Sequence, residues 1–433
     1  MTHFFLHCLR ALLAGCALGW TLTAAPATWP YPQSASKKGL QVQMVDDALE
    51  LGVRHAALNF NFGQLLAPGA GPEEPGIEFH GTMHRFHRAY LEAMDHQIKT
   101  LSDHGVVVSI ILLNYEPADP VLRRILLHPG YDPKCPNHLS AFNAVTPEGR
   151  EWLEASMRFL AERWSRPDQA HGRVANWIVS NEVNSHWFWS NMGHVSLDTF
   201  VADHLQTVRL IHSAVRTASK NARVFLSLEH HWNIHYPGGD ETQTFAARPF
   251  LEAFARGARQ GGDFDWNIAF HPYPENLGHP QTWNDKSALP DFRTTPRITF
   301  KNIDQLIRFL DQPALQFKGQ RRHVILSEQG FHTPGGPDGE TIQAAAYCYA
   351  WKKIERLDGI DSFILHRHVD HAQEGGLALG LWTHQPGTIA TPGRHKRIYD
   401  VFRAADGPKA DEAFRFALPV IGIQSWDEIA KPK

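Results

Sequence analysis

Two glutamates, Glu182 and Glu328, each follow a short apolar run with the pattern of a buried β-strand. Glu182 comes after residues 174–180, and Glu328 comes after residues 323–326. Glycoside hydrolysis needs such a pair, because one carboxyl group protonates the leaving oxygen while the other attacks the anomeric carbon or activates water. We predict that the two glutamates form a catalytic pair. The structural alternative for each is a salt bridge or a helix cap.

Polar side chains also stand at the ends of the other predicted strands. They are Asn59, Asn61, Asn181, Glu229, His231, His271, Tyr273, His366 and His368. In a parallel α/β barrel the C-terminal ends of the strands form one face, and that face carries the active site. A single such residue would be structural in most cases, but a ring of them indicates a functional face. We predict that these residues bind substrate, with a structural role favoured for Glu229.

Tryptophans flank two of these strand ends. Trp187 and Trp189 follow Glu182, and Trp232 follows the next predicted strand. The chain is also rich in rings as a whole, with 13 Trp, 25 Phe and 27 His. An indole can stack on the flat face of a ring-shaped ligand, or it can close the rim of a barrel. Both roles stay open, and all three tryptophans are candidate substrate-binding residues.

Strands and helices alternate along the chain. Apolar runs predict strands at residues 53–62, 106–113, 174–180, 223–228, 266–270, 323–326 and 360–365. Periodic apolar positions predict helices at residues 42–51, 148–164, 197–219, 249–259, 341–357 and 396–403, and further helices that carry Leu91 and Ile303. The clearest strand, residues 106–113, is apolar without alternation, which is typical of a strand buried on both faces. This order predicts an α/β fold, a (β/α)8 TIM barrel in one domain at residues 39–433.

Seven strands are visible, whereas a closed barrel needs eight. The eighth is expected either in a poorly patterned segment before Val42 or in the apolar run at residues 418–423. An open doubly wound sheet is the alternative, although no glycine-rich nucleotide-binding loop follows any strand. Long loops at residues 63–82, with a small hairpin, and at residues 114–147 are expected to shape one end of a cleft. In a barrel, strands three apart lie nearly opposite, so Glu182 and Glu328 should face each other.

The strand-end motifs resemble those of the clan A glycoside hydrolases. Asn181-Glu182, followed three strands later by Ser327-Glu328-Gln329-Gly330, is similar to the clan's acid/base and nucleophile motifs, although Val183 stands where the clan usually has Pro. The resemblance implies that Glu182 is the acid/base, Glu328 the nucleophile, and Asn181 the ligand of the sugar 2-hydroxyl. It also implies retention of configuration and places the unseen strand first in the barrel.

The same resemblance assigns further residues to the substrate site. His271 and Tyr273 match the clan's position at the end of strand six, and Trp382 matches the Trp that commonly follows strand eight. Glu182 then needs a raised pKa, for which the loop with Trp187 and Trp189 could supply an apolar wall, while Arg367 could keep Glu328 ionised. Together with the His271-Pro272-Tyr273-Pro274 and residue 366–371 motifs, the chain resembles a bacterial family of barrels without an assigned function.

Two other functions compete with this interpretation. Residues 366–371 hold three histidines and one aspartate, a density that suits a divalent metal and a metal-dependent hydrolase. We predict no metal and no cofactor, because imidazoles also bind sugar hydroxyls or brace carboxylates. A non-catalytic sugar-binding barrel is the third alternative, although such barrels usually lose one carboxylate. Glu374, in the loop after the last strand, is favoured as a structural residue.

The composition excludes some partners. The formal net charge is −3 without a long charge run, so nothing indicates a nucleic-acid partner or an acidic membrane surface. A carbohydrate substrate is the expected partner. No stretch is apolar enough over sufficient length to cross a bilayer.

The N-terminus has the pattern of an export signal. Arg10 precedes an apolar run, and small residues follow at residues 23–27, so a signal peptide is predicted at residues 1–27 and a linker at residues 28–38. Cys16 is an alternative lipid attachment site, less favoured because the run stays apolar beyond it. We expect a bacterial periplasmic or extracellular protein. Outside this segment only Cys135 and Cys348 remain, and two isolated thiols are at least as well supported as a disulfide.

Overall fold

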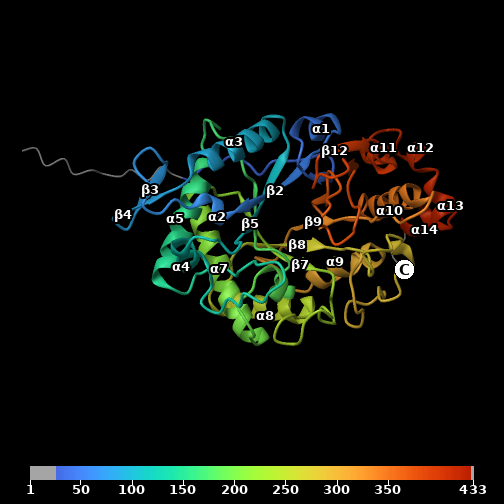
Figure 1. Ribbon diagram of the computed structural model, residues 1–433. Helices are drawn as coiled ribbons and strands as arrows, with labels where there is room; N and C mark the ends of the chain where they lie inside the picture. Colours follow the sequence, from blue (N-terminus) through green and yellow to red (C-terminus); the bar gives the residue numbers. More distant parts are fainter. Residues whose placement is uncertain (1–25, 431–433) are drawn as a thin grey trace, which may run out of the picture.

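The computed structural model describes residues 26–430 (Figure 1). Eight parallel strands form a closed barrel, which confirms the predicted (β/α)8 TIM fold. In barrel order they are β1 (Lys38–Gln41), β2 (His55–Asn61), β5 (Val107–Leu113), β6 (Asn176–Val179), β7 (Arg223–Glu229), β8 (Trp266–His271), β9 (Val324–Gln329) and β10 (Ser362–Leu365). Strand β1 pairs with both β2 and β10 and closes the ring. The predicted signal peptide, with Cys16, lies outside the described residues except for positions 26 and 27.

The strand that the pattern does not reveal is β1, which lies before Val42. It has four residues and only one large apolar side chain, Leu40. Gly39 is required there, because a Cβ atom at this position would lie 2.8 Å from Ile364 Cγ1 on β10. The alternative at residues 418–423 is wrong, since that run forms α13 (Ala417–Ile421).

Helices surround the barrel between consecutive strands (Figure 1). They are α1 (Val45–Glu50), α3 (Arg88–Asp103), α5 (Pro147–Arg163), α7 (Leu197–Ala218), α8 (Ala247–Gln260), α9 (Asp304–Leu310), α10 (Gly339–Ile354) and α11 (Arg397–Ala404). Side-chain caps begin two of them: Thr146 accepts from Gly149 N before α5, and Ser196 accepts from Thr199 N before α7. Pro147 at the first turn of α5 suits its missing N–H. No helix in residues 26–430 combines the length and apolarity that crossing a bilayer requires.

Smaller elements occupy the loops. They are α2 (Phe62–Leu65), β3 (Gly76–Phe79), β4 (Thr82–Arg85), α4 (Pro120–Leu126), η1 (Val183–Ser185), α6 (His186–Trp189), η2 (Thr282–Asn284), η3 (Phe300–Asn302), β11 (Trp382–His384), β12 (Pro392–His395), α12 (Ala410–Phe414), α13, and α14 (Asp427–Ala430). The predicted hairpin is β3–β4, but it packs on α5, where His84 contacts Trp152 and Arg158 lies over Phe79.

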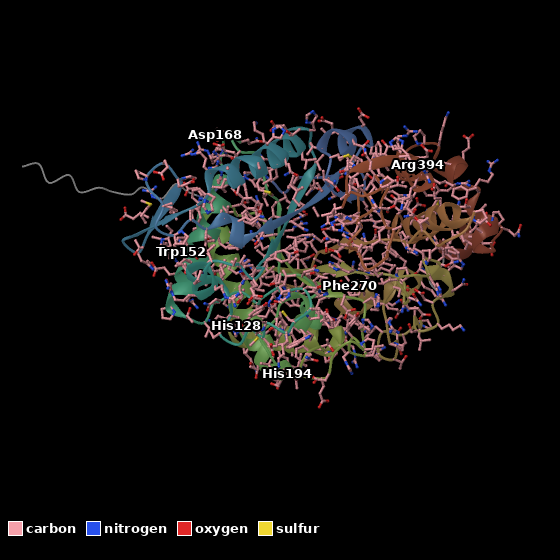
Figure 2. All side chains as sticks on the ribbon, in the orientation of Figure 1. His128, Trp152, Asp168, His194, Phe270 and Arg394 are labelled. Carbon is pink, nitrogen blue, oxygen red and sulfur yellow. The ribbon has the colours of Figure 1, made fainter. Side chains whose placement is uncertain are left out.

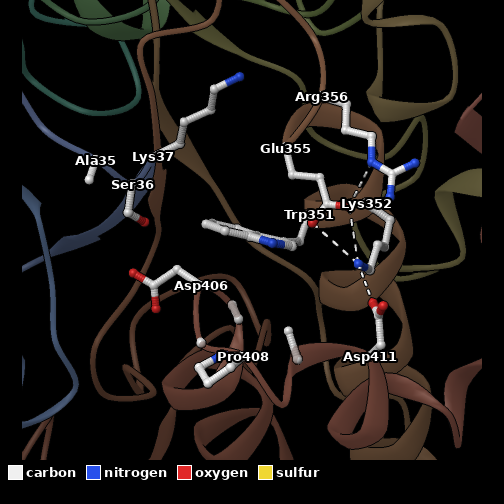
Figure 3. A pocket seen from close by; sticks show the side chains of 13 residues that line it. Ala35, Ser36, Lys37, Trp351, Lys352, Glu355, Arg356, Asp406, Pro408 and Asp411 are labelled. Atoms are coloured by element: carbon white, nitrogen blue, oxygen red, sulfur yellow. Dashed lines mark hydrogen bonds and ion pairs between the residues drawn. The ribbon is translucent and has the colours of Figure 1, made fainter.

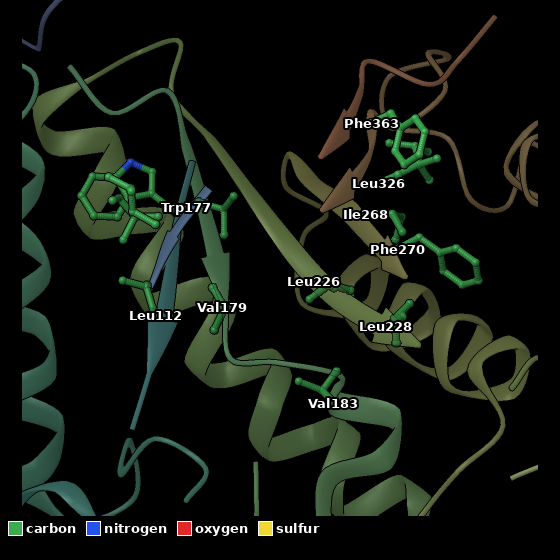
Figure 4. Close-up of a cluster of buried hydrophobic side chains, with 14 of the residues drawn as sticks. Leu112, Trp177, Val179, Val183, Leu226, Leu228, Ile268, Phe270, Leu326 and Phe363 are labelled. Carbon is green, nitrogen blue, oxygen red and sulfur yellow. The ribbon is translucent and has the colours of Figure 1, made fainter. Parts of the chain in front are cut away.

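The strands bury both faces. A small inner layer fills the barrel with side chains that include Ile111, Ile178, Phe225 and Ile325. A larger outer layer packs under the helices, and Figure 4 draws part of it, including Leu112, Trp177, Leu226, Phe270 and Phe363. Phe270 lies in the interior, whereas Asp168 and Arg394 lie at the periphery (Figure 2). Burial on both faces explains why the strands lack polar alternation.

The segment before β1 packs against the N-terminal end of the barrel. The Tyr31 hydroxyl donates to Asn176 Oδ1 at 2.8 Å, and the Arg223 guanidinium lies 3.5 Å from the centre of the Tyr31 ring. Asn176 and Arg223 are the first residues of β6 and β7. Most of the segment predicted as a linker therefore covers the base of the barrel, away from the strand ends that carry Glu182 and Glu328.

Candidate active site

The backbone is strained where β6 delivers Glu182 to the barrel mouth. Ser180 has φ 62°, and Glu182 has φ 37° and ψ 53°, so two non-glycine residues adopt left-handed conformations within three positions. The Glu182 amide donates to Ser227 Oγ on β7 at 3.0 Å and thereby holds this turn. Strain of this kind costs about 1–3 kcal/mol per residue and is concentrated at functional sites.

His271, the last residue of β8, contacts the Glu182 side chain. Its Nδ1 lies 2.9 Å from Glu182 Oε1. Its Nε2 lies 3.0 Å from Ser327 Oγ and 3.3 Å from Ser227 Oγ, so hydroxyls of the two neighbouring strands orient the ring. His271 is 1% exposed. The side chain of Glu182 is 13% exposed, so it can still reach the cleft.

Glu328 stands on β9 beside Glu182. One side-chain oxygen or ring nitrogen from each of Glu182, His271 and Glu328 lies within 4.8 Å of the corresponding atoms of the other two residues. An oxygen of one carboxyl group is therefore at most 4.8 Å from an oxygen of the other. The Tyr273 hydroxyl donates to Glu328 Oε1 at 3.2 Å. Gly330 permits the close approach of β9 and β10 here, because a Cβ atom at this position would lie 2.2 Å from the His366 carbonyl oxygen.

The environment raises the pKa of both Glu182 and His271. Burial raises the pKa of Glu182 by more than its contact with His271 lowers it, and the charges of Glu328 and Glu229 raise it further. Burial lowers the pKa of His271, but the contact with Glu182 and the charges of Glu328 and Glu229 outweigh this, so the net shift is upward. The pair therefore holds its protons to a higher pH than isolated side chains would.

Asn181 and Trp189 complete the wall around Glu182. Asn181 Oδ1 accepts from Ser227 Oγ at 3.3 Å, while its Nδ2 has no hydrogen bond to any described residue. Trp189 is half-buried and packs on the inner layer of the barrel, next to Leu139 from the long loop after β5. That loop thus borders the mouth as predicted, whereas the β3–β4 hairpin does not. Trp187 is 8% exposed and lies against His194, so Trp189 is the better placed of the two tryptophans.

A second acidic cluster lies at the end of β7. Glu229 Oε1 accepts from Asn184 Nδ2 at 2.6 Å and from Ser185 Oγ at 3.0 Å. Glu229 Oε2 accepts from the His231 amide at 2.8 Å and lies 2.5 Å from His231 Nδ1. Burial would raise the pKa of Glu229, but the charge and hydrogen bonds of His231, with His230, lower it to about 2. Glu229 therefore anchors the turn that follows Glu182.

The histidines of residues 366–371 do not converge on one point. His366 Nδ1 contacts Gln41 Oε1, and its Nε2 lies 3.0 Å from Glu374 Oε1. His368 Nε2 lies 2.7 Å from Asp47 Oδ2, and its Nδ1 accepts from two backbone amides. Asp370 accepts from Lys396 Nζ at 2.8 Å. The metal site that stood as the alternative for this segment is not assembled, because the donor atoms of His366, His368 and Asp370 face different partners.

Arg367 also differs from its predicted role. Its guanidinium pairs with Glu374, which makes Glu374 the loop anchor that was favoured, and Glu328 has Tyr273 as its hydrogen-bond donor instead. The pKa of Glu374 falls to about 2, because its contacts with His366 and Arg367 outweigh its burial.

Several predicted substrate-binding residues are committed to structural contacts. Trp232 is fully buried in the outer layer and donates to the Phe292 carbonyl at 2.8 Å, so it cannot stack on a substrate. Asn61 accepts from Gly63 N and caps α2. Asn59 is exposed and accepts from Gln41 Nε2 at 3.0 Å. Trp382 donates to Asp47 Oδ2 at 3.0 Å, in the same cluster as His368.

Four residues at the mouth were not singled out from the sequence. Ser227 and Ser327 orient His271, and two exposed tyrosines, Tyr115 and Tyr236, lie near the carboxylates. Burial and the charge of Glu328 raise the pKa of Tyr115, whereas burial and the charges of Glu182 and Glu229 raise that of Tyr236. The serines had a detectable signal, because Ser227 precedes Glu229 by two positions and Ser327 directly precedes Glu328. The tyrosines lie in loops that carry no such pattern.

A hollow of about 460 Å³ at the base of the barrel is structural (Figure 3). Lys352 donates to Glu355 at 3.0 Å and to Asp411 at 2.6 Å across it. Lys37 donates to the carbonyl of Ile354, the last residue of α10, and to that of Leu357 just after it. These pairs satisfy the charges of the hollow. They lie at the N-terminal end of the barrel, whereas the active sites of such barrels lie at the C-terminal end.

The two cysteines of the described chain, Cys135 and Cys348, are buried and free.

Comparison with known proteins supports the fold. A family model described as a family of unknown function (DUF5722) matches residues 30–429. No curated protein matches the sequence. A family 39 glycoside hydrolase from Bacteroides cellulosilyticus WH2 is similar in structure, with a TM-score of 0.52 and 13% identity over 89% of this chain and 64% of that one. This chain therefore spans slightly less than two thirds of that enzyme.

Two further solved structures are similar. A glucosidase from Croceicoccus marinus has a TM-score of 0.51 and 13% identity, over 88% of this chain and 70% of that one. A β-glucosidase from Pyrococcus furiosus has a TM-score of 0.50 and 15% identity, over 87% and 86%. At such identity the likeness is one of fold, and it confirms the (β/α)8 barrel.

Proposed function

The chain belongs to the family of unknown function DUF5722, and from the geometry of its site we propose that it is a glycoside hydrolase that cleaves an O-glycosidic bond in a poly- or oligosaccharide. The observation that carries the proposal is the approach of Glu182 and Glu328 to within 4.8 Å at the barrel mouth. Neither carboxylate pairs with an Arg or Lys of the described chain. Two partly buried carboxylates this close repel each other when both are ionised, which is a cost that substrate chemistry can explain.

The separation favours retention of configuration. Retaining enzymes have carboxyl groups about 5–5.5 Å apart, whereas inverting enzymes need about 6.5–9.5 Å to admit water. In the proposed mechanism Glu182 protonates the glycosidic oxygen, and Glu328 attacks the anomeric carbon. Glu182 then removes a proton from the water that hydrolyses the glycosyl intermediate.

The surrounding groups suit these roles. Burial raises the pKa of Glu182, and a raised pKa suits the carboxyl group that must donate a proton to the leaving oxygen. The hydroxyl of Tyr273 donates to Glu328 Oε1 and thereby orients the carboxylate that must attack. The free Nδ2 of Asn181 is placed to donate to a sugar hydroxyl next to the bond being cleaved, and Trp189 offers a ring at the mouth for stacking.

The experiment begins with 4-nitrophenyl glycosides of glucose, mannose and xylose, and follows release of nitrophenol by the purified protein. Glu182→Gln and Glu328→Gln should each reduce the rate at least about a thousandfold, while the matched change Glu92→Gln on the exposed face of α3 should not. NMR of the first product should detect the same anomer as in the substrate. Full activity in either site variant, or an inverted first product, contradicts the assignment.

Rescue of activity by azide distinguishes the proposed roles of Glu182 and Glu328. Azide should restore turnover in Glu182→Ala with formation of a glycosyl azide of retained configuration, because the covalent intermediate still forms. In Glu328→Ala, azide attacks in place of the carboxylate and should give the inverted azide. Exchange of these two outcomes would mean that the roles of Glu182 and Glu328 are reversed.

A metal-dependent hydrolase is the second candidate, now at a different place. The donor atoms of Glu182, His271 and Glu328 lie close enough together to hold an ion. Activity that disappears after treatment with EDTA and returns with Zn²⁺ would favour this candidate. Unchanged activity after chelation would favour the two-carboxylate mechanism, in which Glu182 must carry a proton rather than a metal.

Export is part of the same proposal and rests on the sequence of residues 1–27. We expect a periplasmic or extracellular enzyme whose mature chain begins after Ala25 or Ala27. N-terminal sequencing of the native protein tests this, and a chain that begins at Met1 or at a lipid-modified Cys16 would contradict it.

A further inference from the structure

The ring of His231 is held by Glu229 with one nitrogen directed elsewhere. Both oxygens of Glu229 are acceptors, so His231 Nδ1, 2.5 Å from Oε2, carries a hydrogen. The His231 amide donates to the same oxygen, which fixes the ring from two sides. A neutral imidazole protonated at Nδ1 presents Nε2 as a hydrogen-bond acceptor.

The second nitrogen of His231 is unused within the molecule. Nε2 makes no hydrogen bond with residues 26–430, and it is not among the nitrogen atoms that are sealed from solvent, unlike Nδ1 of the neighbouring His230. The dyad therefore presents an oriented acceptor that solvent can reach. Packing alone does not require the charged carboxylate of Glu229 beside the His231 ring.

Tyr236 lies next to this acceptor. Its ring centre is 5.3 Å from that of His231 and 4.9 Å from that of Phe188, and both pairs are edge-to-face. Tyr236 is 37% exposed, and its hydroxyl has no partner among the described residues. Two neighbouring rings thus hold an aromatic face and a hydroxyl at the surface of the cleft.

The position of this group relative to the two carboxylates is asymmetric. Tyr236 packs edge-to-face on His231, which binds Glu229, and on Phe188 of α6, a short helix that follows Glu182. Asn184 and Ser185, which bind Glu229, follow Glu182 directly in the chain. His231 and Tyr236 therefore stand on the Glu182 side of the cleft, where a protonated leaving group would be released.

Resting on the proposed function, we propose that His231 and Tyr236 form a binding site for a hydroxylated leaving group, so that the substrate is a glycan cleaved between two sugars. The His231 Nε2 accepts from a hydroxyl of the departing sugar, and the Tyr236 ring stacks on it while its hydroxyl hydrogen-bonds. An aryl leaving group has no hydroxyl to offer and gains only the stacking contact.

The test compares kcat/KM on a 4-nitrophenyl glycoside with kcat/KM on the disaccharide of the same sugar. The probes are 4-nitrophenyl β-glucoside with cellobiose, and the corresponding mannose and xylose pairs. Tyr236→Phe should lower kcat/KM on the disaccharide about tenfold or more, and change it less than about threefold on the nitrophenyl substrate. His231→Ala also removes a hydrogen bond of Glu229, so it should lower kcat/KM on both substrates, with a loss on the disaccharide about tenfold larger than on the nitrophenyl substrate. Tyr236→Phe keeps the ring contacts, so it covers the case in which His231→Ala fails to fold.

Tyr115→Phe is the matched control on the Glu328 side, and it should change both substrates by the same factor. Equal losses on both substrates in His231→Ala and Tyr236→Phe would overturn the inference, because they would mean that these residues only position Glu182. Absence of any loss would overturn it as well. A wild-type protein that hydrolyses the nitrophenyl substrate but no disaccharide would overturn this inference alone, whereas inactivity on both would overturn the proposed function with it.

Discussion

Glu182 and Glu229 end neighbouring strands of the same barrel, yet their environments have opposite effects on their protons. Glu229 receives four hydrogen bonds from Asn184, Ser185 and His231, and its pKa falls to about 2. Glu182 has one side-chain partner, His271, and burial raises its pKa. The difference teaches that the number of donors around a buried carboxylate separates a structural anchor from a proposed proton donor.

Glu182 and Glu229 also differ in backbone conformation. Glu182 sits at a left-handed position with φ 37°, whereas Glu229 lies within the regular ladder of β7. The anchor supports the strained residue, because Glu229 binds Asn184 and Ser185 just after it. A carboxylate with satisfied hydrogen bonds thus stabilises the turn that holds an unsatisfied one.

The largest effect that this comparison predicts is on activity. Glu182→Gln should lower turnover at least about a thousandfold. The free energy of unfolding should stay equal or rise, because a neutral amide avoids the burial cost that raises the pKa of Glu182. Nitrophenyl glycoside hydrolysis and urea denaturation measure the two quantities. A Glu182→Gln protein that is active, or is destabilised as strongly as a Glu229 variant, would remove the distinction between the two glutamates.

Glu229→Gln should act chiefly on stability. Its amide nitrogen would face donors from Asn184, Ser185 or His231, and one or two charge-assisted hydrogen bonds would be lost. We expect the free energy of unfolding to fall by about 2–3 kcal/mol, with a partial loss of activity. Denaturant unfolding with Glu92→Gln as the control measures this. Stability equal to that of the wild type would contradict the role of Glu229 as an anchor.

The pH dependence of stability should run in opposite directions for the two groups. Because the pKa of Glu182 is raised by burial above its ordinary 4.5, its contribution is full below pH 4.5 and is lost as pH rises through the folded value. The contribution of Glu229 is full above pH 4.5 and is lost as pH falls toward 2. As pH increases from 4.5, the wild type should therefore lose stability relative to Glu182→Gln. As pH decreases below 4.5, the wild type should lose stability relative to Glu229→Gln. Unfolding at several pH values checks both, and parallel slopes would contradict the contrast.

Ser227→Ala should have the smallest effect. The hydroxyl accepts from the Glu182 amide and contacts His271 and Asn181, so its loss loosens the Glu182 side without removing a charge. We expect destabilisation of about 1 kcal/mol and a fall in kcat of severalfold. Ser327→Ala removes only the contact with His271, so we expect it to reduce stability and kcat less than Ser227→Ala does. A larger loss in Ser327→Ala would mean that the turn at Glu182 is held mainly from β9.

The sequence was most informative where one residue's neighbours along the chain decide its environment. Apolar runs such as residues 106–113 predicted strands, because a strand buried on both faces must be apolar throughout. Alternation of these runs with helices then placed Glu182 and Glu328 at one barrel face. Strand β1 was not recognised from the sequence, because four residues with one large apolar side chain carry no such pattern.

Side-chain roles were predictable only in part, because the type of a residue does not determine its partner. Trp232 stands at a strand end like Trp189, yet its indole packs into the outer layer. The histidines of residues 366–371 are dense in sequence, but His366 and His368 contact Glu374 and Asp47 in different directions. Tyr236, which borders the cleft, lies in a loop without a recognisable pattern.

By itself, then, the sequence determined the order of strands and helices and the pair of glutamates at the barrel mouth. Hydrophobic periodicity is local, and parallel strands bring their C-terminal ends together whatever the loops contain. Only the tertiary structure decided that the pKa of Glu182 is raised while that of Glu229 is lowered. That distinction depends on how many donors reach each carboxylate from other strands and loops, and those distances are set by the closed barrel rather than by any one segment.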